Sequence, residues 1–117
     1  MRIIIGGAGR VGTELARALR AEEMDVVLVD NDSRAVKNAQ NLDVLVIHGD
    51  LTRRDKLNEA GIGEAEVFVA ATNSDERKLI ACALAEHSHY EFGGAKAKPL
   101  LSLCRVRGMN FIQEQKC

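Results

Sequence analysis

A glycine-rich segment directly after an apolar run constrains the fold of this 117-residue chain more than any other feature. Residues 3–5 are all isoleucine, and Gly7, Gly9 and Gly12 follow in a G-x-G-x-x-G spacing. β-Branched residues favour a strand. In this spacing the first glycine permits a tight turn, the second lets a pyrophosphate approach the backbone, and the third lets the next helix pack against the strand. The segment therefore predicts a strand–turn–helix unit that binds phosphate at the positive end of a helix.

A carboxylate ends the next apolar run. Residues 26–29 are apolar and Asp30 follows them, about twenty residues after the glycines, where an acidic side chain can accept both hydroxyls of an adenosine ribose. A glycine-rich turn without a ligand is the alternative, since glycines are common in loops. The strand before the turn, the amphipathic helix after it and Asp30 together favour nucleotide binding over an empty fold.

The composition limits the class of protein. At 117 residues the chain is expected to form one domain, and its net charge of −1 gives no basic surface for nucleic acid. Its apolar runs are far shorter than the ~20 residues that span a bilayer, so we expect a cytoplasmic protein without direct membrane insertion. Cys82, Cys104 and Cys117 form no C-x-x-C pair. The first two are expected in the core, and the third at an exposed end.

Strand and helix patterns alternate along the chain. This alternation predicts an α/β fold, a Rossmann-type doubly wound parallel sheet with strand order 3-2-1-4-5. The expected strands are residues 2–5, 25–29, 44–47, 66–71 and 100–106. The expected helices cover residues 10–22, a segment after Asp32 or Ser33, a segment with a capping box from Thr52 to Asp55, and a segment that begins at Asn73 or Ser74.

The pattern breaks near the C-terminal end. Residues 87–99 contain the only proline, Pro99, and two adjacent glycines, so we expect a surface loop between the fourth helix and the fifth strand. Residues 1–107 then form a nucleotide-binding domain and residues 108–117 a short tail. On this interpretation the sheet is truncated after its fifth strand.

The candidate site follows from the sheet topology. In an open doubly wound sheet, ligands bind outside the carboxyl ends of the strands, where the strand order reverses between the first and fourth strands. The residues at those ends are the candidate nucleotide-binding residues: Gly7, Ala8, Gly9, Arg10, Val11, Gly12, Asp30, Asn31, Arg34, Gly49, Asp50, Leu51, Ala71, Thr72, Asn73, Asp75 and Arg105.

Several of these residues have two interpretations. Asp30 would repel a 2′-phosphate, which favours NAD(H), ATP, ADP or AMP over NADP, but the nearby Arg34 argues the other way. Asp50 is placed to accept the adenine amine or to cap a helix. Arg10 is placed to reach a phosphate or to lie in solvent, and Arg105 to reach the far half of a dinucleotide or to lie at a strand end.

No catalytic or metal-binding residue is predicted. Glu86, His87, His89 and Glu91 have metal-ligand chemistry, but they lie where a helix is expected to give way to a loop, so the sequence fixes no ligand geometry. No nucleophile has an evident base beside it.

Longer motifs add a family resemblance to this interpretation. Residues 3–12, 29–30, 46–50, 59–62, 65–76 and 105–107 together closely resemble the TrkA N-terminal family, the domains that regulate conductance of potassium, also called RCK or KTN domains. The resemblance spans nearly the whole chain. After Arg107 the chain departs from the family pattern, which continues through a helix, a sixth strand and another helix that help to build the dimer.

The resemblance implies a function. Domains of this family sense NAD(H), ATP or ADP in the cytosol and, as homodimers or larger rings, gate a potassium transporter or channel at the inner face of the membrane without chemical turnover. By resemblance, Gly7, Gly9 and Gly12 would hold phosphate, Asp30 the ribose and Asp50 the adenine, and Thr72 to Asp75 would contact the far side of the ligand. The alternative is a domain or fragment of an NAD-dependent oxidoreductase, whose substrate pocket the chain is too short to supply.

Overall fold

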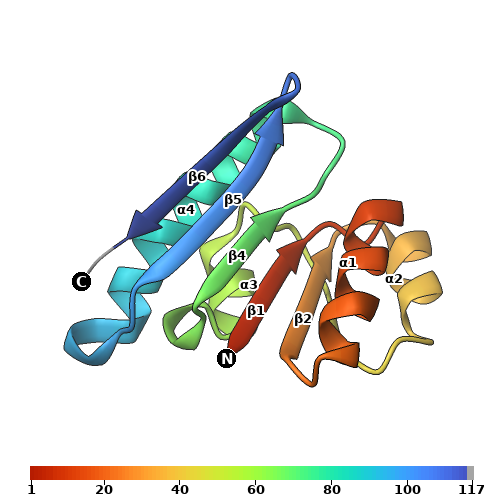
Figure 1. Ribbon diagram of the computed structural model, residues 1–117, viewed down its shortest axis with the longest axis horizontal. Coiled ribbons are helices and arrows are strands. Elements are labelled where there is room, and N and C mark those ends of the chain that lie inside the picture. The colour runs from red at the N-terminus through yellow and green to blue at the C-terminus, as the bar shows by residue number, and fades with distance from the viewer. Residues whose placement is uncertain (116–117) are drawn as a thin grey trace.

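The computed structural model describes residues 1–115 as one six-stranded sheet with helices on both faces (Figure 1). The strands are β1 (Arg2–Gly6), β2 (Asp25–Asp30), β3 (Leu45–His48), β4 (Val67–Ala70), β5 (Leu100–Val106) and β6 (Met109–Gln115). The helices are α1 (Arg10–Ala21), α2 (Ser33–Ala39), α3 (Arg54–Glu59) and α4 (Asp75–Gly93), with short 3-10 turns η1 (Ile62–Glu64) and η2 (Gly94–Lys96).

The strand order is β3-β2-β1-β4-β5-β6, and β1 to β5 run parallel. This confirms the predicted α/β fold and the order 3-2-1-4-5. The isoleucines of β1 explain its central place, because they alternate between two apolar layers. Ile4 packs in the cluster that contains residues of α3 and α4, whereas Ile3 and Ile5 pack with residues of α1 and α2.

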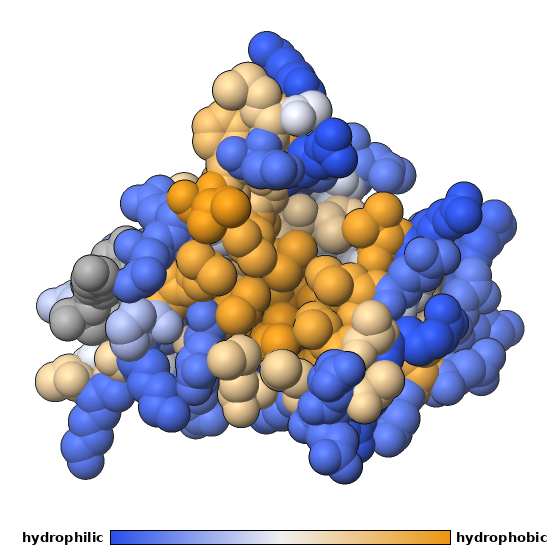
Figure 2. Space-filling view, in the orientation of Figure 1, coloured by the Kyte–Doolittle hydropathy of each residue, from blue (hydrophilic) through white to orange (hydrophobic). Residues whose placement is uncertain are grey.

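The two faces of the sheet are covered unequally. In Figure 1, α4 runs behind β5 and β6, whereas α1 and α2 lie at the β2 end. Figure 2 shows hydrophobic residues gathered at the centre of the visible face. On that face the outward side chains of β4 and β5, among them Val69 and Leu103, are only partly buried. The α1 side of β4 and β5 therefore remains open to ligand or protein.

The sheet continues beyond the fifth strand. The sequence suggested a short tail for residues 108–117, but Met109–Gln115 pair antiparallel with β5, with Val106 opposite Met109. Arg107 and Gly108 make the turn, with φ angles of 51° and 79°. A two-residue turn with positive φ at both positions fits the twist of a β-hairpin. Asparagine or aspartate before glycine is the common sequence signal for such a turn. This chain has Arg107 in that position, so the sequence did not predict the hairpin.

Helix α4 is longer than predicted. It extends to Gly93 and so includes much of the segment 87–99 that the sequence assigned to a loop. His89 explains the difference, because its ring is fully buried and both ring nitrogens contact backbone carbonyls, at 2.7 Å from Ile62 O and 2.5 Å from Lys98 O. A tertiary contact thus holds a polar sequence in helical form.

The predicted helix starts are partly confirmed. Asp32 caps α2 by accepting the N–H of Arg34 at 3.0 Å, and Ser74 caps α4 by accepting the N–H of Arg77 at 3.2 Å. The capping box expected from Thr52 does not form, because α3 begins after Arg53, which makes no side-chain cap. None of the helices in residues 1–115 combines the length and the apolar character that a membrane crossing needs.

We expect His89→Leu to destabilise the fold by about 2–4 kcal/mol, because the carbonyl of Ile62 or Lys98 that accepts the ring N–H would lose its donor in a water-poor environment. Urea denaturation measures this cost. His87→Leu is the matched control, since His87 is 66% exposed and lies 3.4 Å from the exposed Glu91. Equal stability losses for the two variants would contradict the role given to His89.

Candidate functional site

The glycine-rich loop lies at the carboxyl end of β1, and two of its glycines are required by the fold itself. Gly7 has a φ of +123°, and a Cβ there would lie 2.8 Å from the carbonyl carbon of Ala71. A Cβ at Gly12 would lie 1.8 Å from the carbonyl oxygen of Gly7. The turn and the packing of α1 against β1 therefore explain both residues without any ligand.

Gly9 differs from the other two glycines. A Cβ added at Gly9 would meet no atom within 4 Å, and its φ of −79° is open to any residue. Gly9 is also the N-cap of α1, where it supplies no side-chain cap, and the first turn of α1 carries no acidic residue. The start of α1 thus has open space beside the α-carbon of Gly9 and no acidic residue in its first turn.

Asp30 joins the end of β2 to the glycine-rich loop. Its Oδ2 accepts the N–H of Ala8 at 2.7 Å, and its Oδ1 accepts the N–H of Asp32 at 2.9 Å. The structure therefore brings Asp30 beside the loop, as the sequence predicted. Each carboxylate oxygen can accept more than one hydrogen bond, so these two contacts leave acceptor capacity for ribose hydroxyls.

Asp50 lies at the end of β3 and binds two neighbouring elements. Its Oδ1 accepts the N–H of Thr52 at 2.9 Å, the hydroxyl of Thr52 at 2.7 Å and the guanidinium of Arg77 at 2.6 Å. Partial burial alone would raise the pKa of Asp50, but the hydrogen bonds from Thr52 and the charge of Arg77 outweigh it and lower the pKa. Asp50 thus holds the turn before α3 to the first turn of α4.

Three other predicted residues line this edge of the sheet. The side chain of Leu51 is 2% exposed and packs in the core, so contact with adenine would need it to move. The backbone of Gly49 continues from β3, its N–H donating to Asp30 O at 2.9 Å. The backbone oxygen of Asn31 lies 3.1 Å from Nε2 of His48. These residues support the site mainly through the backbone.

A pocket of about 510 Å³ opens at the carboxyl ends of β4 and β5. Its walls include predicted site residues from three segments: Val11, Ala71, Thr72, Asn73 and Arg105. The structure therefore gathers these residues around one hollow next to the glycine-rich loop. Asp75 lies at its edge, with Oδ1 3.7 Å from the ammonium of Lys78.

Sequence reasoning missed two parts of this pocket. Lys78 lines it with a side chain that is 17% exposed and donates to the carbonyl of Arg105 at 2.7 Å. Asn110, Phe111 and Ile112 of β6 form another wall. The three-residue spacing of Asp75 and Lys78 on a helix could have indicated that Lys78 lies beside the site. The wall from β6 could not be predicted, because it depends on the hairpin of β5 and β6.

The remaining predicted cations lie on the other side of the loop. Arg10 and Arg34 line a hollow of about 380 Å³ between α1 and α2, together with Ala8 and Gly9. The side chain of Arg10 is 90% exposed and lies 3.7 Å from Glu14. Arg10 is therefore placed in solvent beside the loop, within reach of a ligand that binds there.

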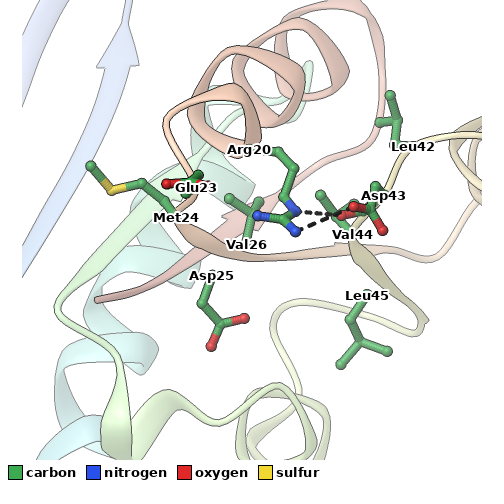
Figure 3. A pocket seen from close by; sticks show the side chains of 9 residues that line it. All are labelled: Arg20, Glu23, Met24, Asp25, Val26, Leu42, Asp43, Val44 and Leu45. Atoms are coloured by element: carbon green, nitrogen blue, oxygen red, sulfur yellow. Dashed lines mark hydrogen bonds and ion pairs between the residues drawn. The ribbon is translucent and has the colours of Figure 1, made fainter.

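A third hollow, of about 410 Å³, lies at the opposite end of the sheet, where β2 and β3 begin (Figure 3). Arg20 donates there to the backbone oxygen of Asp43 at 3.0 Å and pairs with its carboxylate at 3.2 Å. Asp25 is paired with Arg2 at 2.9 Å. Because these charges are matched within the protein and no predicted site residue lines the hollow, we place the candidate site at the carboxyl ends.

His87, His89 and Cys82 do not line the two hollows beside the glycine-rich loop, whereas Cys104 lines the pocket at β4 and β5. His89 is turned into the core and His87 lies 3.4 Å from Glu91, and residues 1–115 contain no group of three or more His, Cys, Asp or Glu side chains suited to a metal ion. Cys104 is buried, as predicted, and Cys82 is partly buried. Burial, together with the neighbouring Cys104 and Glu86, raises the pKa of Cys82 to about 12, so its thiol stays protonated near neutral pH. Cys117 lies outside the described residues.

We expect Asp50→Asn to cost about 1–2 kcal/mol of stability near neutral pH, since it removes the charge that Thr52 and Arg77 bind and solvent screens part of the effect. A carboxylate with a lowered pKa stabilises the fold fully above its ordinary value of 3.8, and this contribution is lost as the pH falls through the lower folded-state value. The difference between wild type and variant, measured by urea denaturation, should therefore be largest above pH 3.8 and shrink as the pH falls below that value. A difference independent of pH would contradict this account.

Comparisons with known proteins agree on the family. The family model for the TrkA-N domain matches residues 3–96. A Trk system potassium uptake protein TrkA homolog of Methanothermobacter thermautotrophicus is 46% identical over 85 residues, which cover 72% of this chain and 39% of that protein. The TrkA of Haemophilus influenzae is 34% identical over 116 residues, 98% of this chain and 24% of that protein. The chain thus spans well under half the length of these relatives.

Solved structures show the same fold. A Kef C-terminal domain from Shewanella denitrificans, in an AMP-bound form, superposes with a TM-score of 0.70 and 28% identity over 91% of this chain and 59% of that one. The NAD(P)-binding domain of an exopolyphosphatase-related protein from Archaeoglobus fulgidus gives a TM-score of 0.73 at 16% identity, over 89% of this chain and 71% of that one. With its Rossmann-type sheet, its glycine-rich loop and Asp30 in place, the chain belongs to the TrkA-N domain family.

Proposed function

We propose that this domain binds an adenine nucleotide, NAD(H) first and ATP, ADP or AMP as alternatives, and regulates a potassium transport system without chemical turnover. The observation that carries the proposal is the space over Gly9, because the fold has no need for a glycine there. A pyrophosphate that rests on the loop backbone does need one. Gly9 is therefore best explained by a ligand that the loop binds.

The neighbouring groups support the same ligand. Asp30 stands beside the loop with acceptor capacity for a ribose, and Asp50 lies at the β3 end, where the adenine is expected. Thr72, Asn73 and Arg105 line the pocket on the other side of the loop, which offers room for the second half of a dinucleotide. The AMP-bound Kef domain with the same fold supports an adenine nucleotide as ligand.

A regulatory role fits the chemistry of the site. Among the described residues that line the two hollows beside the loop, no hydrogen bond joins a nucleophilic side chain to a base, since the hydroxyls of Thr13 and Thr72 are bound to backbone oxygens. The relatives named as potassium uptake proteins support a transport system as the partner. We propose that the domain acts at the cytoplasmic face of the membrane, as a homodimer or larger oligomer, and that its partner is a potassium transporter or channel subunit.

Gly9→Ala tests the proposal directly. We expect the variant to lose little melting temperature beyond the cost of alanine at a helix N-cap, since its methyl group meets no protein atom within 4 Å. We expect it to bind NADH, ATP, ADP or AMP at least about tenfold more weakly, because the methyl group occupies the path of the phosphates. Titration calorimetry measures affinity, and constant NADH absorbance reports the absence of turnover.

Gly12→Ala is the matched control for folding. Its Cβ would lie 1.8 Å from the oxygen of Gly7, so we expect a lower melting temperature whether or not a ligand is present. If the wild type binds none of the four nucleotides, or if Gly9→Ala binds them as the wild type does, the proposal is wrong.

A further inference from the structure

The hollow between α1 and α2 has an excess of positive charge. Its lining includes Arg10 and Arg17 from α1 and Arg34 from the first turn of α2. Asp32 is the only carboxylate among the described residues that line it, and its Oδ1 accepts the backbone N–H of Arg34 at 3.0 Å. The lining of this hollow, whose volume is about 380 Å³, thus carries three guanidinium groups and one carboxylate.

Two of these guanidinium groups have no partner among the described residues. Within residues 1–115, the side chains of Arg17 and Arg34 make no ion pair or hydrogen bond, and Arg10 makes only the 3.7 Å contact with the exposed Glu14. Arg20, one turn after Arg17 on α1, is by contrast bound twice by Asp43 (Figure 3). The cations without a strong partner are therefore the three that line this hollow.

The hollow adjoins the position expected for the ribose. Ala8 and Gly9 line it, and the N–H of Ala8 donates to Asp30. Asp32 lines it as well, and its N–H donates to the other oxygen of Asp30. A ribose held by Asp30 would thus lie at the rim of the hollow. The two N–H groups offset part of the negative charge of Asp30.

Phosphate is the group that matches this arrangement. Guanidinium groups bind phosphate oxygens through paired, charge-assisted hydrogen bonds, and an arginine beside the end of the second strand is the usual partner of a 2′-phosphate. The amides of Asn38 and Asn41 line the same hollow and supply further donors. The sequence alone predicts that Asp30 repels a 2′-phosphate. In the structure, the attraction of three guanidinium groups opposes that repulsion.

We propose that the hollow between α1 and α2 is a second phosphate subsite, which holds the 2′-phosphate of a bound adenine nucleotide such as NADP(H). This inference rests on the proposed function, since the glycine-rich loop and Asp30 must first hold the nucleotide. The domain then accepts 2′-phosphorylated nucleotides in addition to NAD(H).

Titration calorimetry of the full chain with two small probes tests the subsite. One probe is 5′-AMP, and the other is adenosine 2′,5′-bisphosphate, which differs from it only by the 2′-phosphate. At low salt we expect the bisphosphate to bind about tenfold more tightly, because it adds charge-assisted contacts with two or more guanidinium groups.

Variants test whether the difference in affinity between the two probes arises in the hollow between α1 and α2. Arg17→Gln should reduce the tenfold preference to about twofold or less and leave the affinity for 5′-AMP unchanged, because Arg17 lies away from the loop. Arg34→Gln should reduce the preference as well. Arg20→Gln is the matched control on the same helix and should leave the preference intact, since Arg20 is already engaged by Asp43.

The outcomes separate the two proposals. Normal binding of 5′-AMP with equal or weaker binding of the bisphosphate overturns the subsite and leaves the proposed function standing. Failure of both probes to bind overturns the subsite, and the proposed function is wrong as well if NADH, ATP and ADP also fail to bind. If inorganic phosphate binds alone in an Arg17-dependent manner while the bisphosphate shows no preference, the hollow binds a free anion and the assignment to the 2′-phosphate is wrong.

Discussion

The carboxylate of Asp30 is the contact on which the candidate site depends. Its two oxygens fix the N–H of Ala8 in the glycine-rich loop and the N–H of Asp32 at the start of α2. Because β1 and β2 are paired in parallel register, this one side chain ties together the two segments that a nucleotide would bridge. The position of the loop relative to α2, and so the shape of the hollow between α1 and α2, follows from it.

The central sheet was predictable from the sequence because its strands carry their own signal. Runs of Val, Ile and Leu mark β1 and β2, and buried parallel strands need such runs on both faces. The end of α4 and the hairpin of β5 and β6 were not predictable in the same way. The helix includes His89 because its ring contacts the carbonyl of Ile62, which is distant in sequence, and that of Lys98, which lies in a loop. The turn between β5 and β6 has Arg107 where asparagine or aspartate is usual.

The site was predictable where one segment supplies it. The glycine-rich loop and Asp30 stand where the sequence placed them. The sequence did not predict that β6 lines the pocket at β4 and β5, or that Arg17 lines the hollow between α1 and α2. Each depends on how two elements pack together. The spacing of Arg10 and Arg17 on α1 shows that they share a side of that helix, but only the packing of α2 brings Arg34 to the same hollow.

The proposed function requires ligand binding to reach a partner, and the contacts at the site suggest a route through α4. A ligand changes a conformational equilibrium only if it binds one state better than the other. Asp50 at the proposed adenine edge holds Arg77 in the first turn of α4, and Lys78 in the same turn faces the pocket at β4 and β5. A dinucleotide that contacts both ends of the site therefore acts on one turn of α4 from two sides. Ile80 and Tyr90 are exposed apolar side chains of the same helix, so under the proposed function α4 would connect the ligand contacts to a surface that a partner can bind.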